Sequence, residues 1–297
     1  MHQTVASVAA AVDSGPFIVE SPAEQAVPVV FASPHSGSHY PERFVRSSRL
    51  DPLTLRRSED AFIDELFAEA PHLGAPLIKA TFPRAYVDPN REAWELDPAM
   101  FVEALPDFVN TASLRVRVGL GTIARVVANG TEIYRDRLSF AEARTRIENL
   151  YMPYHQALAG LVDATHRRFG HALLIDCHSM PSVGGPTDRD AGRRRVDFVL
   201  GDCHGTSAAP SVMEAVAAAF KREGFSVARN EPYAGGFTTR HYGRPEARRH
   251  AFQIEVNRAL YMDEARIERS AGFDDLVAVI ARVQRSIVEF ARDALAR

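Results

Sequence analysis

The chain lacks the marks of secreted, membrane-spanning and disulfide-rich proteins. Among its 297 residues are only two cysteines, Cys177 and Cys203, which cannot form a disulfide framework and suit a reducing cytoplasm. No apolar run approaches the roughly 20 residues that cross a membrane. Residues 1–15 have no basic segment of the kind that opens a signal peptide. We therefore expect a cytoplasmic protein with no membrane partner.

An excess of charge of one sign is missing as well. The formal net charge is only −3, so no overall field favours nucleic acid. The basic run 193-RRR-195 is short and is typical of a solvated loop. Lysine occurs only as Lys79 and Lys221, and the other basic side chains are arginines, which bind carboxylates through a planar fork. We therefore expect no nucleic-acid partner.

What the sequence does contain is a series of apolar, strand-length runs with helical patterns between several of them. Strands that alternate with helices predict an α/β layered fold with a largely parallel sheet. We expect one α/β domain over residues 16–297 and a flexible lead-in over residues 1–15. The predicted strands are 27–32, 76–82, 172–176, 196–202, 225–230 and 251–257, and the predicted helices are 58–70, 139–170, 211–224 and about 274–296.

Two local features of this pattern have a direct structural expectation. Ser58 is a candidate N-cap of the 58–70 helix, whose first turn is acidic. Residues 114–135 alternate in the manner of a β-hairpin, with Asn129-Gly130 as its turn.

Two histidines follow apolar runs in the same way, inside short turns of small residues. The stretch 29-VVFASPHSG-37 presents His35, and 172-ALLIDCHSMP-181 presents His178. In an open α/β sheet, ligands bind beyond the carboxyl ends of the strands, so both imidazoles should reach one site. Alternation places Asp176 on the same side as His178 and Cys177 on the other. Asp176 is therefore a candidate to orient a histidine, and Cys177 is a poor candidate for the site.

Two imidazoles, one carboxylate and an open position form a catalytic zinc site. The third ligand is not supplied by a His-x-x-Glu pair, because position 38 is serine. We expect it at the start of the 58–70 helix, as Asp60 or alternatively Glu59. In 252-FQIEV-256, alternation puts Glu255 on the face opposite the apolar side chains. Partial burial should raise the pKa of Glu255, which makes it a candidate general base.

Two further segments carry groups suited to binding an anionic substrate. The turn 83-PRAYVDPNR-91 brings Arg84, Asn90 and Arg91 close together along the chain, and Arg forks bind carboxylates through two hydrogen bonds. The segment 231-EPYAGGFTTRHYGRP-245 combines a Gly-Gly pair, which lets backbone approach a ligand, with Arg240. Each segment alone is also compatible with an ordinary turn or loop.

As an ordered set, seven motifs of the chain resemble the N-formylglutamate amidohydrolase (deformylase) family over about residues 28–265. The resemblance implies a three-layer α/β/α sandwich with a mixed, largely parallel sheet, related to zinc carboxypeptidases and aspartoacylases. It also implies hydrolysis of N-formyl-L-glutamate to formate and L-glutamate, the last step of one histidine-degradation route. The motifs are PHSG, SEDAFIDELF, PRAYVDPNR, DCHSM, LGDCHGTS, GGFTTRHYG and QIEVNRALYMDE.

The resemblance implies roles for these residues. One Zn²⁺, or another divalent ion, is expected on His35 and His178, with Asp60 inferred as the acid ligand because Ser38 departs from the related pattern. Asn90 and Arg91 look like the pair that binds a substrate carboxylate. Arg84 looks like the partner arginine that polarises the carbonyl, and Glu255 looks like the general base. Arg240 is a further candidate for the substrate's carboxylates. Cys203-His204 stands where the family more often has an arginine and an aromatic residue.

Three alternatives remain open from the sequence. One is a related zinc hydrolase of another N-acyl aspartate or glutamate. Another is a non-catalytic homologue that kept the anion pocket, against which the presence of both histidines and Glu255 argues. The last is a cysteine hydrolase that uses Cys177, which the alternation argument disfavours.

Overall fold

The computed structural model describes residues 15–127, 130–186 and 188–294, so most of the predicted lead-in and Asn129 lie outside it. A seven-stranded sheet has the order β1-β3-β2-β4-β7-β5-β6. β1 against β3 and β5 against β7 are antiparallel, whereas the other neighbouring pairs are parallel. The strands are β1 Phe17–Glu20, β2 Val29–Ser33, β3 Leu77–Ala80, β4 Ala172–Met180, β5 Phe198–Gly201, β6 Val227–Arg229 and β7 Arg249–Asn257, and β8 Met262–Asp263 pairs with β9 Glu268–Arg269 in a small ribbon.

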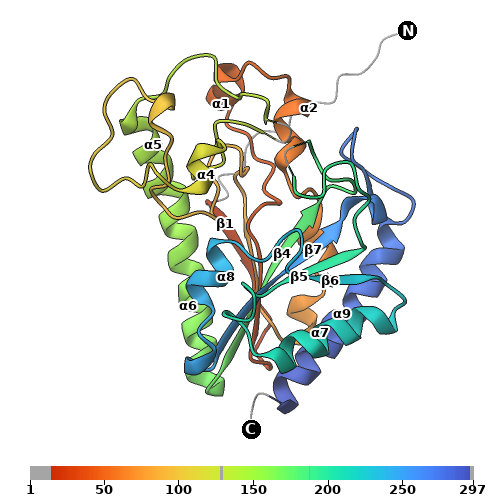
Figure 1. The fold of residues 1–297 in the computed structure, drawn as a ribbon. Helices are drawn as coiled ribbons and strands as arrows, with labels where there is room; N and C mark the ends of the chain where they lie inside the picture. The colour runs from red at the N-terminus through yellow and green to blue at the C-terminus, as the bar shows by residue number, and fades with distance from the viewer. Residues whose placement is uncertain (1–14, 128–129, 187, 295–297) are drawn as a thin grey trace.

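Helices cover both faces of this sheet, as Figure 1 shows, with α6 and α8 on one side and α7 and α9 on the other. The α-helices are α1 Glu42–Ser47, α2 Pro52–Leu55, α3 Ile63–Leu66, α4 Leu114–Arg117, α5 Phe140–Arg146, α6 Met152–Phe169, α7 Pro210–Arg222, α8 Phe237–Tyr242 and α9 Phe273–Ala294. A π-helical turn, Ile147–Tyr151, joins α5 to α6. No helix in the described part of the chain is long and apolar enough to cross a membrane.

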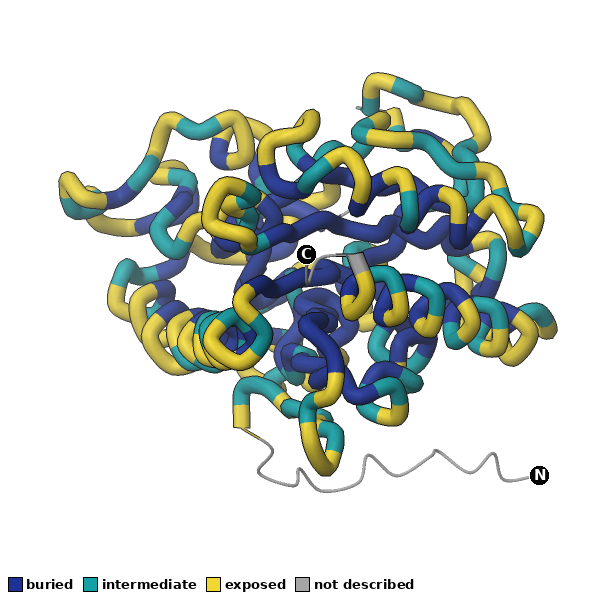
Figure 2. The backbone as a smooth tube through the Cα atoms, turned by 90° about the horizontal axis from the view of Figure 1, so that it is seen from below, coloured by how far each residue is buried: buried dark blue, intermediate teal, exposed yellow. Residues whose placement is uncertain are grey.

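The two faces of the sheet bury separate hydrophobic clusters, because successive side chains of a strand point to opposite sides. On β4, Leu173 and Ile175 pack with α3, α7 and α9. Leu174, between them, packs with α1, α5 and α6. Figure 2 shows the resulting buried central layer between helices whose outer surfaces are exposed. The predicted three-layer α/β/α sandwich with a mixed, largely parallel sheet is therefore confirmed.

All six predicted strands are present, and β1, a short edge strand, was not predicted. The predicted 58–70 helix is wrong: α3 covers only Ile63–Leu66, and Phe62 before it has a left-handed φ of 67°. The segment before α3 makes tertiary hydrogen bonds in place of helical ones, beginning with the Asp60 amide, which donates to the His35 carbonyl at 3.0 Å. Ile63 and Leu66 of this segment nevertheless enter the hydrophobic core.

The predicted hairpin over 114–135 is wrong over most of its length. Residues Leu114–Arg117 form the short helix α4, whose N-cap Ser113 accepts a hydrogen bond from the Val116 amide. Of the predicted pairing, only an isolated antiparallel bridge between Val126 and Glu132 is found in the described residues. The N-cap hydrogen bond therefore stabilises a helix at positions where a weak alternation of polar and apolar side chains had predicted a strand.

Candidate active site

Three neighbouring parallel strands bring the predicted site residues to one edge of the sheet. His178 on β4 lies directly opposite Glu255 on β7. On the other side of β4, Asp176 is in register with Ala32 of β2, and His35 follows the end of β2 at Ser33. Since the carboxyl ends of parallel neighbours point the same way, these side chains meet in the position typical of ligand sites in α/β folds.

Asp60 lies between the two histidines and contacts the same nitrogen atom of each ring. Its Oδ2 is 3.3 Å from Nδ1 of His35 and 3.1 Å from Nδ1 of His178. The ring centroids of the two histidines are 4.7 Å apart. One ligand atom from each of the three residues lies within 4.8 Å of the others, and all three residues are buried. The three expected ligands therefore converge, and the Glu59 carboxylate points elsewhere, to Arg56 at 2.8 Å.

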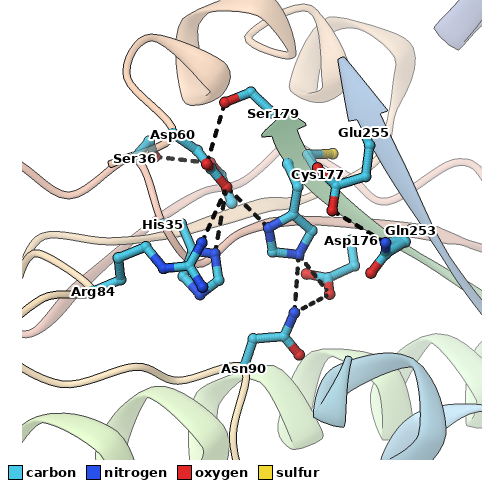
Figure 3. Close-up of polar contacts among 12 residues, drawn as sticks. His35, Ser36, Asp60, Arg84, Asn90, Asp176, Cys177, Ser179, Gln253 and Glu255 are labelled. Carbon is cyan, nitrogen blue, oxygen red and sulfur yellow. Dashed lines mark hydrogen bonds and ion pairs between the residues drawn. The ribbon is translucent and has the colours of Figure 1, made fainter. Parts of the chain in front are cut away.

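The opposite nitrogen of each ring is held by a second carboxylate, of which Figure 3 labels Asp176. Nε2 of His35 is 2.7 Å from Oδ1 of Asp88, and Nε2 of His178 is 2.9 Å from Oδ2 of Asp176. A carboxylate bound to one ring nitrogen fixes that nitrogen as the donor and leaves the other with a lone pair. The role expected for Asp176 is supported by this contact, while the role of Asp88 was not predicted.

This arrangement fits a divalent cation on chemical grounds. Nδ1 of His35 is buried and makes no hydrogen bond in the described structure, although Oδ2 of Asp60 lies 3.3 Å away. Two imidazole nitrogens and one carboxylate oxygen are the donor set that Zn²⁺ takes in many catalytic sites. Backing carboxylates on both rings are the usual outer partners of such ligands.

The charges of the cluster shift its pKa values strongly. Burial alone would raise the pKa of Asp60, but the hydrogen bond from His178 and the proximity of His35 and Arg84 hold it well below its usual range. Burial would lower the pKa of His178, but Asp176 and Asp60 raise it well above its usual value. In the absence of a cation, therefore, a proton on His178 is stabilised among the carboxylates.

Glu255 occupies the position expected of a base beside this cluster. It is 8% exposed, and its Oε1 accepts a hydrogen bond of 3.1 Å from Gln253. The predicted alternation along β7 is confirmed, since Phe252 and Ile254 enter the core on the other face. Burial raises the pKa of Glu255 to about 8, and the cationic form of His178 opposes that rise. The direction of the shift is the one expected from the sequence.

Arg84 and Arg91 reach the cluster through Asp88. Nη2 of Arg84 is 2.8 Å from Oδ2 of Asp88, and its Nη1 is 3.9 Å from Oδ2 of Asp60. Nη2 of Arg91 is 3.7 Å from the same oxygen of Asp88. Burial, together with the charges of Arg115 and Arg84, lowers the pKa of Arg91 to about 10. Arg91 thus stays protonated at neutral pH, and the cationic surroundings favour an anionic ligand.

Asn90 connects this cluster to α8. Its amide nitrogen lies 3.1 Å from Nε2 of His178 and 3.3 Å from Oδ2 of Asp176, and its Oδ1 accepts from the Thr238 amide at 2.9 Å. A Cβ at Gly236 would overlap the Asn90 amide, so glycine permits this close approach. Arg240, on the same helix, is exposed and lies outside the ion-pair network of Arg84, Arg91 and Asp88 among the described residues.

Two residues that sequence reasoning missed hold the Pro89–Arg91 segment in place. Tyr151, at the end of the π-helical turn, donates from its hydroxyl to the Arg91 carbonyl at 2.7 Å. Nε2 of His155, one turn later, lies 2.8 Å from the Pro89 carbonyl. Burial lowers the pKa of His155 to about 4, so the ring is neutral and Nε2 carries the proton donated to that carbonyl. In sequence, both residues lie within the helix predicted over 139–170, and no local signal distinguishes them.

The two cysteines lie apart from this chemistry. Cys177 is fully buried in the hydrophobic cluster on the opposite face of β4, and burial raises the pKa of its thiol. A buried, protonated thiol is a poor nucleophile. Cys203 and His204 form a left-handed turn after β5, with φ values of 52° and 56°.

Comparisons with known proteins agree on one family. A family model described as N-formylglutamate amidohydrolase matches residues 27–262. N-formylglutamate deformylase of Pseudomonas aeruginosa is 32% identical over 243 residues, covering 80% of this chain and 83% of that protein. The corresponding protein of Pseudomonas putida is 29% identical over 241 residues, with the same coverage of each chain, 80% and 83%. A crystal structure of N-formylglutamate amidohydrolase from Ralstonia eutropha is 37% identical with a TM-score of 0.86, covering 94% of this chain and 99% of that one.

The contact between Tyr151 and the Arg91 carbonyl gives a direct prediction. Tyr151→Phe should lower the free energy of unfolding by about 1–3 kcal/mol, because it leaves a buried carbonyl without its donor. Tyr154→Phe is the matched control, since the hydroxyl of Tyr154 is buried without a hydrogen-bond partner in the described structure. The control should change stability by less than about 0.5 kcal/mol, or increase it. Urea unfolding of both variants measures the difference, and equal losses would contradict the anchoring role.

Proposed function

Because the chain belongs to the N-formylglutamate amidohydrolase family, we propose that it hydrolyses N-formyl-L-glutamate to formate and L-glutamate with the help of a bound divalent metal, in the context of histidine degradation. The observation that carries the proposal is the meeting of two imidazole Nδ1 atoms and one carboxylate oxygen beside a buried glutamate. Ordinary structural histidines do not need two backing carboxylates and a third one between them.

His35, Asp60 and His178 are the residues that would hold the metal. A Zn²⁺ ion bound there would polarise the formyl carbonyl and lower the pKa of a bound water. Three protein ligands leave room for water and substrate in the manner of catalytic rather than structural zinc sites. Asp88 and Asp176 would keep both rings oriented with Nδ1 toward the ion.

Glu255 is the proposed general base. Its position opposite His178 on the neighbouring strand puts the carboxylate at the rim of the cluster, as Figure 3 shows. Glu255 would accept the proton of the attacking water and deliver it to the departing amine as the C–N bond breaks, so that the proton count balances. Arg84 is the proposed stabiliser of the oxyanion that develops on the formyl oxygen, because its guanidinium reaches into the cluster next to Asp60.

The substrate's carboxylates are proposed to bind the arginines on the cationic side of the cluster. Arg91 is the first candidate, with Arg240 available from α8 as a second, and a dicarboxylate requires more than one such group. Asn90 is proposed to contribute alongside Arg91, although its side-chain oxygen already accepts from the Thr238 amide and its nitrogen lies near His178. In this geometry Asn90 acts on substrate mainly by holding the segment that carries Arg91.

Formate release tests the proposed function directly. Zinc-loaded protein should release formate from N-formyl-L-glutamate, and removal of the metal by a chelator should abolish release, which added Zn²⁺ should restore. A parallel panel of N-acetyl and N-succinyl glutamate and aspartate examines the acyl group, because one methyl group alters transition-state binding by only about 1–3 kcal/mol. Preference for a non-formyl substrate would reassign the activity to another N-acyl amino acid. Binding of N-formylglutamate without release of formate would identify a non-catalytic protein.

Glu255→Gln isolates the role of the base. We expect the variant to keep its metal and to lose roughly 100-fold or more in turnover, in line with general-base contributions. In the wild type, turnover should rise with pH as Glu255 loses its proton. The midpoint of this rise should lie at or below the pKa of about 8 that Glu255 has in the metal-free protein, because a bound cation would favour the ionised carboxylate. Glu142→Gln, which makes the same chemical change in an ion pair with Arg146 outside the cluster, is the control. Near-normal turnover of Glu255→Gln would remove Glu255 from the mechanism.

A further inference from the structure

Arg258 is a buried arginine that the proposed reaction does not use. It follows the end of β7 and begins the short 3₁₀ turn Arg258–Leu260. Its guanidinium donates to Oγ of Ser179 at 3.0 Å and to the carbonyls of Arg57 and Glu59 at 3.1 and 2.8 Å. A fourth hydrogen bond, of 3.0 Å, goes to Oδ1 of Asp60. Four hydrogen bonds from one buried guanidinium are more than an ordinary surface ion pair would make.

The contacts of Arg258 divide the two oxygens of Asp60 between different partners. Oδ1 accepts from Arg258 and also from Oγ of Ser179, at 3.2 Å. Oδ2 is the oxygen that faces Nδ1 of His35 and Nδ1 of His178. With two strong donors on Oδ1, the carboxylate cannot rotate without breaking a charge-assisted hydrogen bond in a buried site.

We propose that Arg258, assisted by Ser179, is the positioning residue that makes Asp60 a single-oxygen metal ligand. This inference rests on the proposed metal-dependent function, and it adds residues that the family resemblance did not assign. By holding Oδ1, the pair keeps Oδ2 between the two histidines and leaves the remaining coordination positions to substrate and water.

The backbone contacts of Arg258 support the same role. In a helix that began at Ser58, the Glu59 carbonyl would accept from the Ile63 amide. In the structure that carbonyl accepts from Arg258, and the Asp60 amide donates to His35. Arg258 therefore holds the segment before α3 out of a helix and against the ends of β4 and β7. A single guanidinium thus links the segment of Asp60 to the strands of His178 and Glu255.

An arginine suits this position better than a lysine would. The four acceptors lie around a planar fork, whereas an ammonium is a point charge with three donors. The arginine charge also stays fixed at every working pH. Lysine should therefore replace part of the function, by supplying the charge and one or two of the hydrogen bonds.

Zinc affinity of the metal-free protein tests this inference without reference to turnover. Competition with a chelating dye at pH 7 should show binding about 10–100-fold weaker in Arg258→Met than in the wild type, as for other losses of outer partners of metal ligands. Arg258→Lys should recover part of this loss, and Ser179→Ala should weaken binding by a smaller factor. Arg146→Met removes another buried arginine, whose partners are Tyr134, Tyr86 and Glu142, and should leave zinc affinity within about twofold.

The outcomes separate this inference from the proposed function. A wild-type protein that binds no zinc overturns the metal-dependent function. A wild type that binds zinc, with variants of Arg258 that bind it equally well, overturns only the positioning role. If Arg258→Met does not fold, Arg258→Lys and Ser179→Ala decide the matter. Wild-type affinity in both would contradict the proposal, and weakened binding with an unchanged unfolding midpoint would support it.

Discussion

The structure depends on one buried contact, in which a single oxygen of Asp60 faces Nδ1 of both His35 and His178. Each ring is held from behind by its own carboxylate, Asp88 or Asp176, so neither can turn away. The geometry exists because β2 and β4 are parallel neighbours whose carboxyl ends meet at one edge of the sheet. A pair of inward-facing imidazole lone pairs beside an ionised carboxylate is costly to bury, unless a cation or a proton lies among them.

The charges around this contact explain how the cluster is tolerated in the folded chain. The cluster brings together four buried carboxylates and three arginines, and when no metal is bound Asp176 and Asp60 stabilise a proton on His178. A divalent cation in its place would leave the site positive, which suits an anionic substrate. These groups are Asp60, Asp88, Asp176 and Glu255 among the acids and Arg84, Arg91 and Arg258 among the bases.

The sequence predicted the parts of the fold and site that follow from local alternation. The strands, the side of β4 that carries Asp176 and His178, and the placement of Glu255 all follow from the two-residue period of a strand. The helix predicted over 58–70 failed because its first residues bond to Arg258 and His35 rather than to their own helix. Arg258 is nearly 200 residues away in sequence from the segment that it holds, so no local pattern reports its role. Tyr151 and His155 were missed for the same reason.

The central claim is that His35, Asp60 and His178 share one metal ion. Anomalous X-ray diffraction from crystals of zinc-loaded protein, collected on both sides of the zinc absorption edge, tests it most directly. The expected result is one strong peak bonded to Nδ1 of both histidines and to Oδ2 of Asp60, with Oδ1 still bound to Arg258. An ion bound elsewhere, or an intact cluster without a peak at full zinc occupancy in solution, would contradict the claim.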